Sequence, residues 1–217
     1  MFTIPTLRLQ DGITIPQIGY GTWPISDPNA ERVVATAIAT GYRLIDTAAA
    51  YENEAGVGKG IRASGVSRKE IFLTTKLRDR DHGYKRTLEA CKRSIQILDV
   101  DYLDLYLIHW PNPWKNHFVE SWHALEDLQQ EKLVRTIGVS NFKPAHIDRL
   151  ISERETLPAV NQIQLEPRIG RVALREYNPR RGIVTQAWSP LGRAGDLLQE
   201  PTILSIAERH ECTPAQV

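Results

Sequence analysis

The sequence predicts an α/β fold of the (β/α)₈ TIM barrel type, preceded by a β-hairpin and with the eighth strand missing from the chain. Seven predicted strands are each followed by a helix, and the strands are nearly continuous apolar runs. Such runs are typical of parallel strands covered by helices. A doubly wound sheet would alternate in the same way, but no glycine-rich phosphate motif follows the first strand. The regular alternation therefore favours the barrel.

The first elements are a hairpin, a short strand and a helix. Residues 6–17 alternate apolar and polar around Asp11-Gly12, which favours a two-residue turn. A short strand follows and ends at 19–23. We expect Asp27 to be the N-cap of the next helix and Gly41 to end it.

Strands and helices then alternate to the end of the chain. Strands are expected at 43–47, 71–77, 103–110, 134–139, 159–165 and 182–188, and helices from Asn53, near 84–98, near 118–131, after Pro144, near 171–178 and near 202–210. Pro179 should end its helix early, and Thr213-Pro214 predicts the first turn of another. The glycines of 56–60 (GVGKG) superficially resemble a phosphate loop, but we reject a dinucleotide fingerprint because they lie inside the start of a helix.

Length and composition predict a single domain, residues 1–217, in a soluble cytoplasmic protein without signal peptide or membrane span. The net charge is +1 and no polybasic run is present, so we expect neither nucleic acid nor membrane as a partner. Cys91 and Cys212 fit no metal or redox spacing, and no metal site is expected. His82, His117 and His123 are expected at the surface or on helices.

Polar and aromatic residues gather where the predicted strands end. They are Trp23, Asp46, Lys76, His109-Trp110, Ser140-Asn141, Gln162 and Trp188-Ser189. Barrel enzymes keep their chemistry at this end of the strands. Each residue alone has an ordinary structural interpretation, such as a turn former or a core aromatic. Their common register is what favours a functional site.

Segments along nearly the whole chain resemble those of the aldo-keto reductases. In chain order they are GTW (21–23), DTAAAYENEAGVG (46–58), TTKL (74–77), DLYLIHWP (104–111), IGVSNF (137–142), NQIQ (161–164) and AWSPLG (187–192). The chain most resembles small bacterial members similar to 2,5-diketo-D-gluconate reductase. The resemblance implies a monomer that reduces small aldehyde, ketone or sugar-like carbonyl substrates by hydride transfer from NADP(H), with NAD(H) as the alternative.

The residues themselves explain what such a reaction needs. Hydride attack builds negative charge on the carbonyl oxygen, which must be protonated or stabilised. Tyr51 is the expected general acid, and the Lys76 ammonium, facing it, would lower its pKa from about 10. Asp46 would hold that ammonium, and His109 would orient the substrate oxygen. The resemblance assigns the catalytic roles to the same four residues.

The resemblance also implies the cofactor and substrate contacts. The expected cofactor-binding residues are Thr22, Asp46, Ser140, Asn141, Gln162, Trp188, Ser189, Leu191 and Gly192. The hydroxyl and amide groups of Ser140, Asn141 and Gln162 suit the nicotinamide carboxamide, and Trp188 would stack on the ring. The expected substrate-binding residues are Trp23, Ala50, His109 and Trp110.

The chain departs from the family pattern at its end and after its third predicted barrel strand. The last part of a typical member, with the eighth strand and the segment that grips the 2′-phosphate, is absent, so a C-terminally truncated barrel with two unpaired edges is expected. Arg78 stands where relatives commonly have tryptophan, and we hypothesise a more open, more basic pocket rim. One other class of function stays open: a non-catalytic nucleotide-binding barrel, or an inactive truncated product.

Overall fold

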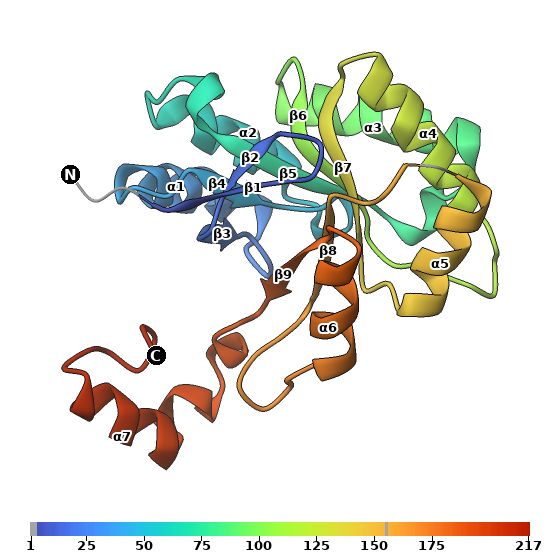
Figure 1. The fold of residues 1–217 in the computed structure, drawn as a ribbon. Coiled ribbons are helices and arrows are strands. Elements are labelled where there is room, and N and C mark those ends of the chain that lie inside the picture. The colour runs from blue at the N-terminus through green and yellow to red at the C-terminus, as the bar shows by residue number, and fades with distance from the viewer. Residues whose placement is uncertain (1–3, 155) are drawn as a thin grey trace.

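The structure is a computed structural model that describes residues 4–154 and 156–217. Its main sheet has seven parallel strands, hydrogen-bonded in chain order (Figure 1). They are β3 (Gly19–Gly21), β4 (Leu44–Asp46), β5 (Phe72–Leu77), β6 (Leu103–Ile108), β7 (Val134–Ser140), β8 (Val160–Gln164) and β9 (Val184–Trp188). Within the described residues β9 does not pair with β3, so the ring is open between these two strands. The predicted seven-stranded α/β barrel is confirmed.

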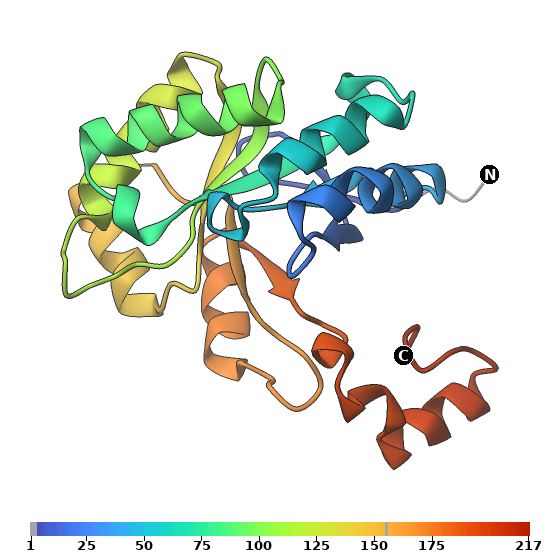
Figure 2. The ribbon, with the colours of Figure 1, turned by 180° about the vertical axis from the view of Figure 1, so that it is seen from behind.

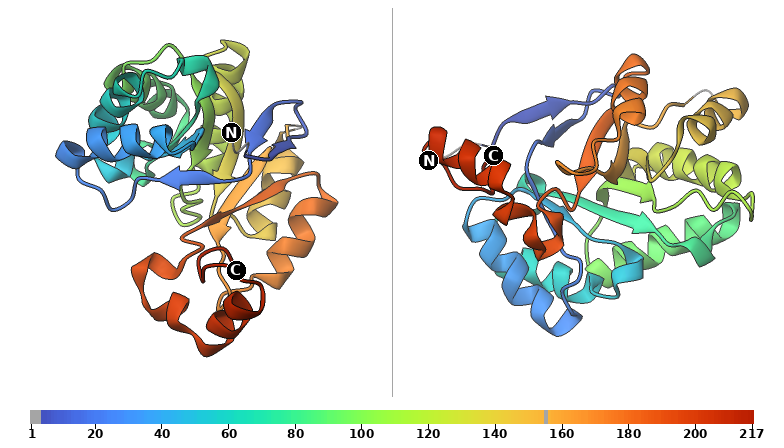
Figure 3. Two further views of the ribbon diagram at one scale, coloured as in Figure 1. Left: turned by 90° about the vertical axis from the view of Figure 1, so that its left-hand side faces the viewer. Right: turned by 90° about the horizontal axis from the view of Figure 1, so that it is seen from below.

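Helices connect the strands and cover their outer face (Figures 1 and 2). They are α1 (Asp27–Ala39), α2 (Glu54–Ala63), α3 (Tyr84–Leu98), α4 (Phe118–Gln130), α5 (Pro144–Glu153), α6 (Val172–Arg180) and α7 (Pro201–Arg209). Short 3₁₀ turns are η1 (Ala49–Tyr51), η2 (Arg68–Glu70), η3 (Asp79–Asp81), η4 (Gly192–Ala194) and η5 (Asp196–Gln199). Beyond β9, α7 lies away from the other helices (Figures 1 and 3). None of the described helices is long and apolar enough to cross a membrane.

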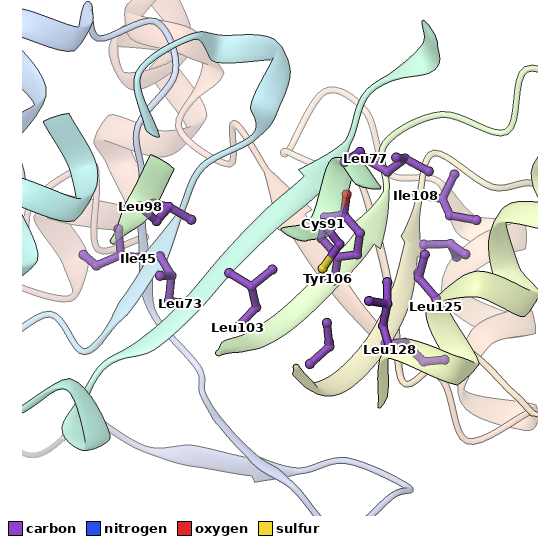
Figure 4. Packing of buried hydrophobic residues seen from close by; sticks show 14 of the residues in the cluster. Ile45, Leu73, Leu77, Cys91, Leu98, Leu103, Tyr106, Ile108, Leu125 and Leu128 are labelled. Carbon is purple, nitrogen blue, oxygen red and sulfur yellow. The ribbon is translucent and has the colours of Figure 1, made fainter. Parts of the chain in front are cut away.

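The main core lies between the strands and the helices (Figure 4). Alternate strand residues point outward, because successive side chains of a strand face opposite sides. Ile45 of β4 and Leu73 of β5 lie beside Leu98 of α3, and Tyr106 of β6 lies beside Cys91 of α3. All five are buried, and the aliphatic side chains of Ile45, Leu73 and Leu98 each contribute about 1.5–3 kcal/mol through burial.

The predicted hairpin closes the N-terminal end of the barrel. Its strands β1 (Thr6–Arg8) and β2 (Thr14–Pro16) pair antiparallel, but the loop that joins them contains Asp11 and Gly12 and is longer than the two-residue turn expected, because the Leu9 backbone N–H donates to the Ile13 carbonyl oxygen at 2.7 Å. Leu9 and Ile15 belong to a second buried cluster with inward-facing residues of the sheet, among them Leu44 and Leu105. The Gln10 amide donates to backbone carbonyls of the segment before β8, at 3.1 and 2.9 Å. This end is therefore filled with apolar side chains, and polar chemistry is left to the opposite end.

Two helix boundaries differ from the prediction. Ser26, not Asp27, is the N-cap of α1, and the Asp27 carboxylate accepts a hydrogen bond from the Gly56 backbone N–H of α2 at 2.7 Å. Pro179 does not end α6, which continues to Arg180. A proline in the last turn removes only one hydrogen bond near the helix end, so the helix tolerates it.

The glycines of the GVGKG segment lie inside α2, as predicted, and serve helix packing. A Cβ atom at Gly56 would lie 2.3 Å from the Asp27 carbonyl oxygen, and one at Gly58 would lie 2.0 Å from the Leu98 carbonyl oxygen. A methyl group fits at neither position. These glycines therefore let α1 and α3 approach α2 closely, which accounts for them without a phosphate-binding role.

The prediction for His82 is wrong. It is 1% exposed and lies in the turn before α3, although we expected it at the surface or on a helix. Neither ring nitrogen has a hydrogen-bond partner among residues 4–154 and 156–217, and burial lowers the pKa of His82 to about 4. His117 is the N-cap residue of α4, and His123 lies on that helix, as expected.

Candidate active site

A layer of polar side chains lies at the C-terminal end of the barrel interior. Strand alternation produces it: Asp46 follows the inward-facing Leu44 by two residues, and Gln162 follows the inward-facing Val160 in the same way. The residues of this layer are Asp46, Lys76, His109, Ser140, Gln162 and Gln186. The structure thus brings together the polar strand ends that the sequence singled out.

Lys76 is the centre of this layer. Its side chain is 1% exposed, and its Nζ donates to the Asp46 carboxylate, to the Thr47 carbonyl oxygen at 2.9 Å and to the Tyr51 hydroxyl at 3.4 Å. Burial disfavours the ammonium form, but Asp46 and Tyr51 together outweigh it, and the pKa of Lys76 is raised above its ordinary value. The site therefore holds a permanent buried positive charge.

Tyr51 lies on η1, between the Lys76 ammonium and the His109 ring. The Tyr51 and His109 rings meet edge to face, with centroids 5.7 Å apart. Burial raises the pKa of Tyr51 above its ordinary value of 10.0, although Lys76 lowers it and Asp46 raises it further. The expectation that Lys76 lowers the pKa of this phenol below its ordinary value is wrong, because desolvation outweighs the ammonium. Tyr51 consequently keeps its proton at neutral pH.

His109 is neutral in this surrounding. Burial, together with the charge of Lys76, lowers the pKa of His109 to about 3. Its carbonyl oxygen accepts a hydrogen bond from the Asn141 side-chain amide at 3.0 Å. A neutral imidazole beside a phenol can donate or accept one hydrogen bond without adding charge.

Asp46 is held from two sides of the barrel. One oxygen accepts from Lys76 of the neighbouring strand, and the other accepts from the Gln162 amide of β8 at 2.7 Å. The Gln162 amide also donates to the Gln186 side-chain oxygen at 2.7 Å. Gln186 was missed from the sequence, although it lies two residues before Trp188 and shares the inward face of Val184.

The residues expected around the nicotinamide form a second hydrogen-bonded group. The Trp188 indole donates to the Asn141 side-chain oxygen at 2.9 Å, and the Asn141 amide donates to the Ser140 hydroxyl at 3.0 Å. Ser140 donates to the Gln162 carbonyl oxygen at 2.9 Å. A hydroxyl and amides beside a fixed indole suit a carboxamide-bearing aromatic ring. The Gln162 amide nitrogen, however, is already engaged by Asp46 and Gln186.

The structure sets Thr22 apart from the other expected cofactor residues. It is fully buried and lies two residues after Tyr20, so both side chains face the same side of the sheet. Tyr20 packs against the core between the strands and the helices, so Thr22 faces away from the barrel interior. Its carbonyl and hydroxyl oxygens accept from the Asn53 amide at 3.2 and 3.3 Å. Asn53, which also accepts from the Thr47 hydroxyl at 2.7 Å, was missed from the sequence. It ties the loops after β3 and β4 together and so fixes the segment that carries Tyr51.

The remaining expected site residues lie in loops after the strands. Ser189, Leu191 and Gly192 follow β9, and Leu191 is 46% exposed. The expected substrate residues Trp23 and Trp110 follow β3 and β6 and are 52% and 45% exposed, and Ala50 is an exposed neighbour of Tyr51. Large apolar rings exposed at this end are suited to contact with a ligand.

Arg78 does not present a free charge. Its Nε donates to the Asp81 carboxylate at 2.6 Å. It lines a cavity of about 330 Å³, together with Glu52 of the η1 end and residues of α2 and α3. None of the four expected catalytic residues lines this cavity. Because Asp81 also pairs with Arg93 at 3.3 Å, one carboxylate serves two arginines and only partly offsets the positive charge that the sequence suggested at the rim.

The model of the aldo/keto reductase family matches residues 17–217. The chain belongs to the aldo/keto reductase family. This aldo/keto reductase is 52% identical over 213 residues to an aldo-keto reductase of Mycolicibacterium smegmatis, and the match covers 98% of this chain and 77% of that protein. The family predicted from the sequence is confirmed, whereas the finer likeness to 2,5-diketo-D-gluconate reductase stays a prediction.

Solved structures of relatives share the fold of this aldo/keto reductase. The crystal structure of an aldo/keto reductase from Brucella melitensis matches with a TM-score of 0.94 at 50% identity, over 99% of this chain and 82% of that one. A point mutant of Gox0644, solved in complex with NADPH, matches with a TM-score of 0.94 at 43% identity, over 99% of this chain and 78% of that one.

Proposed function

We propose that this aldo/keto reductase, acting as one domain over residues 1–217, reduces small aldehydes or ketones with NADP(H). The observation that carries the proposal is the contact between the Tyr51 hydroxyl and the buried Lys76 ammonium, 3.4 Å apart. A bound nicotinamide cofactor supplies a hydride to the carbonyl carbon. The protein's own residues must then manage the charge and the proton at the carbonyl oxygen.

Tyr51 is the proposed proton donor. It holds a proton at neutral pH, because burial raises its pKa. As the proton leaves, the Lys76 ammonium stabilises the phenolate that remains. Asp46 keeps that ammonium charged and in place, and Gln162 in turn fixes Asp46 from the other side of the barrel. Tyr51 is thus uncharged before it gives up its proton, and afterwards the Lys76 ammonium balances the negative charge of its phenolate.

His109 is the proposed orienting group for the substrate oxygen. Because its pKa is lowered to about 3, the ring is neutral and can donate a hydrogen bond without competing with Tyr51 as an acid. Ala50, Trp23 and Trp110 are the proposed walls around the rest of the substrate.

The proposal of NADP(H) as cofactor rests on two supports. A relative of the same family was solved in complex with NADPH. In this chain, Asn141 is hydrogen-bonded to both Ser140 and the Trp188 indole beside the catalytic group. We propose Ser140, Asn141 and Gln162 as carboxamide contacts, Trp188 as the stacking ring, and Ser189, Leu191 and Gly192 as the loop along the cofactor.

The test separates binding from chemistry with Tyr51→Phe, which removes only the hydroxyl. NADPH binding is followed by quenching of tryptophan fluorescence, and turnover by loss of NADPH absorbance after an aldehyde is added. The variant should bind NADPH as the wild type does and lose most of its turnover. Substantial remaining reduction would mean that another group supplies the proton. Quenching without turnover in the wild type would instead support a non-catalytic nucleotide-binding protein.

A further inference from the structure

Arg193 places its guanidinium against two of the indoles at the mouth of the barrel. The central guanidinium carbon lies 4.8 Å from the Trp188 ring and 5.2 Å from the Trp23 ring. Its Nε donates to the Ser189 hydroxyl at 3.3 Å. Within residues 4–154 and 156–217 no carboxylate forms an ion pair with Arg193. The two aromatic faces are therefore its main partners.

The loop that carries Arg193 holds it in this place. Arg193 has φ 55° and ψ 45°, a left-handed backbone conformation that non-glycine residues adopt rarely. Arg168 anchors the same loop through ion pairs to Asp196 at 2.8 Å and Glu200 at 2.6 Å. The positive charge of Arg193 also acts on Tyr51: it lowers the pKa of Tyr51, although burial has the larger, opposite effect.

We propose that the Arg193 guanidinium occupies, in the cofactor-free protein, the aromatic surface that the nicotinamide ring needs, so that cofactor binding must displace it. The inference rests on the proposed function, in which Trp188 is the stacking ring. A guanidinium and a nicotinamide are both flat groups that stack on an indole, and one face of Trp188 cannot hold both. Arg193 is thus a competitor built into the cofactor site.

The expected effect on affinity follows from the two stacking contacts. A cation–π contact at an exposed site is worth about 0.5–1 kcal/mol, so the two contacts favour the blocked state by a factor of about 5–30. The apparent affinity for cofactor equals the intrinsic affinity multiplied by the fraction of molecules in which Arg193 does not cover Trp188. Removing the guanidinium should therefore tighten NADPH binding by up to the same factor.

The experiment compares Arg193→Gln with Arg180→Gln. Both variants lose one positive charge, but Arg180 lies on α6 with its side chain 79% exposed and takes no part in the site. NADPH is titrated by quenching of tryptophan fluorescence, and the binding rate is measured by stopped flow. Arg193→Gln should bind NADPH about 5–30-fold more tightly than wild type and Arg180→Gln. Its binding rate should also exceed the limit that the wild type reaches at high NADPH concentration.

A second readout needs no cofactor. If Arg193 covers Trp188, acrylamide should quench the tryptophan fluorescence of Arg193→Gln more strongly than that of the wild type. Thermal unfolding by circular dichroism verifies that each variant is folded. Equal NADPH affinity in Arg193→Gln and wild type would overturn this inference alone. Weaker binding would overturn it too, since the guanidinium would then hold the cofactor. No binding to any of the proteins would overturn the proposed cofactor as well.

Discussion

Replacing Lys76 with methionine removes the ammonium and keeps an unbranched apolar side chain of similar length. In the structure this ammonium contacts the Asp46 carboxylate, the Thr47 carbonyl oxygen and the Tyr51 hydroxyl. The Lys76 and Asp46 side chains are only 1% and 15% exposed. Breaking a buried ion pair by removing one partner costs about 3–5 kcal/mol, because the other charge stays buried without compensation. The hydrogen bond from Gln162 still supports Asp46, so we expect a loss near the lower value.

The same change should abolish most of the activity. Without the ammonium, the main group that offsets the effect of burial on Tyr51 is lost and only the smaller effect of Arg193 remains, so the pKa of Tyr51 rises further and proton donation becomes harder. General acid catalysis contributes typically about 10²–10⁴-fold. We therefore expect kcat to fall by about 10²–10⁴-fold in Lys76→Met.

Urea unfolding, followed by tryptophan fluorescence, measures the free energy of unfolding, and the loss of NADPH absorbance measures kcat. Lys59→Met is the matched control, because Lys59 is exposed on α2. Adding Asp46→Asn to Lys76→Met should restore part of the stability, since it removes the uncompensated charge, but none of the activity. A stability loss below about 1 kcal/mol, or no recovery in the double variant, would refute the view that this pair is a buried, charged unit.

Three further outcomes are expected. The pH profile of kcat/KM should show no inflection near pH 6.5, since the pKa of His109 is lowered to about 3, and should fall only above pH 10, as Tyr51 loses its proton; a decline centred near pH 6.5 would contradict these assignments. The buried His82 has a pKa of about 4, so the unfolded chain binds a proton at His82 before the folded protein does as the pH falls from 6.5. The free energy of unfolding, measured in urea, should therefore fall between pH 6.5 and 4 by about 3 kcal/mol less in His82→Phe than in the wild type. Identical pH dependence in the two proteins would contradict this. Gly58→Ala would place its Cβ 2.0 Å from the Leu98 carbonyl oxygen and should cost about 1–3 kcal/mol in urea unfolding without changing NADPH affinity. Weaker NADPH binding at unchanged stability would instead indicate a phosphate contact there.

Most of the fold could be predicted because its signals are local. Asp11-Gly12 marked the hairpin, and apolar runs marked each strand to within a few residues. The errors arose where neighbours in space override local preference. Asp27 was expected to be an N-cap, but its carboxylate accepts a hydrogen bond from the Gly56 backbone N–H of another helix. His82 looked like a surface residue, yet the packing around α3 buries it.

The sequence predicted which residues form the candidate site, but not their pKa values. Asp46, Lys76 and His109 stand at strand ends, where alternation alone points them inward. Thr22 is the exception, because it lies on the outward side of the same alternation. Gln186 could have been predicted from strand alternation, because it lies two residues before Trp188 on the same strand and faces the same side. No sequence signal pointed to Arg193, since its contacts with Trp23 and Trp188 depend on the path of a loop.

The sequence by itself determined the order of the strands and helices, the closing hairpin, the family, and the set of polar residues at one end of the barrel. These follow from periodicity, turn residues and chain order, which operate over a few neighbouring positions. Only the tertiary structure decided that Lys76 lies within 3.4 Å of Tyr51, that Gln162 reaches Asp46 across the interior, and that the pKa of Tyr51 is raised. Distances between residues far apart in the chain, and the exclusion of water around them, exist only once the barrel has formed.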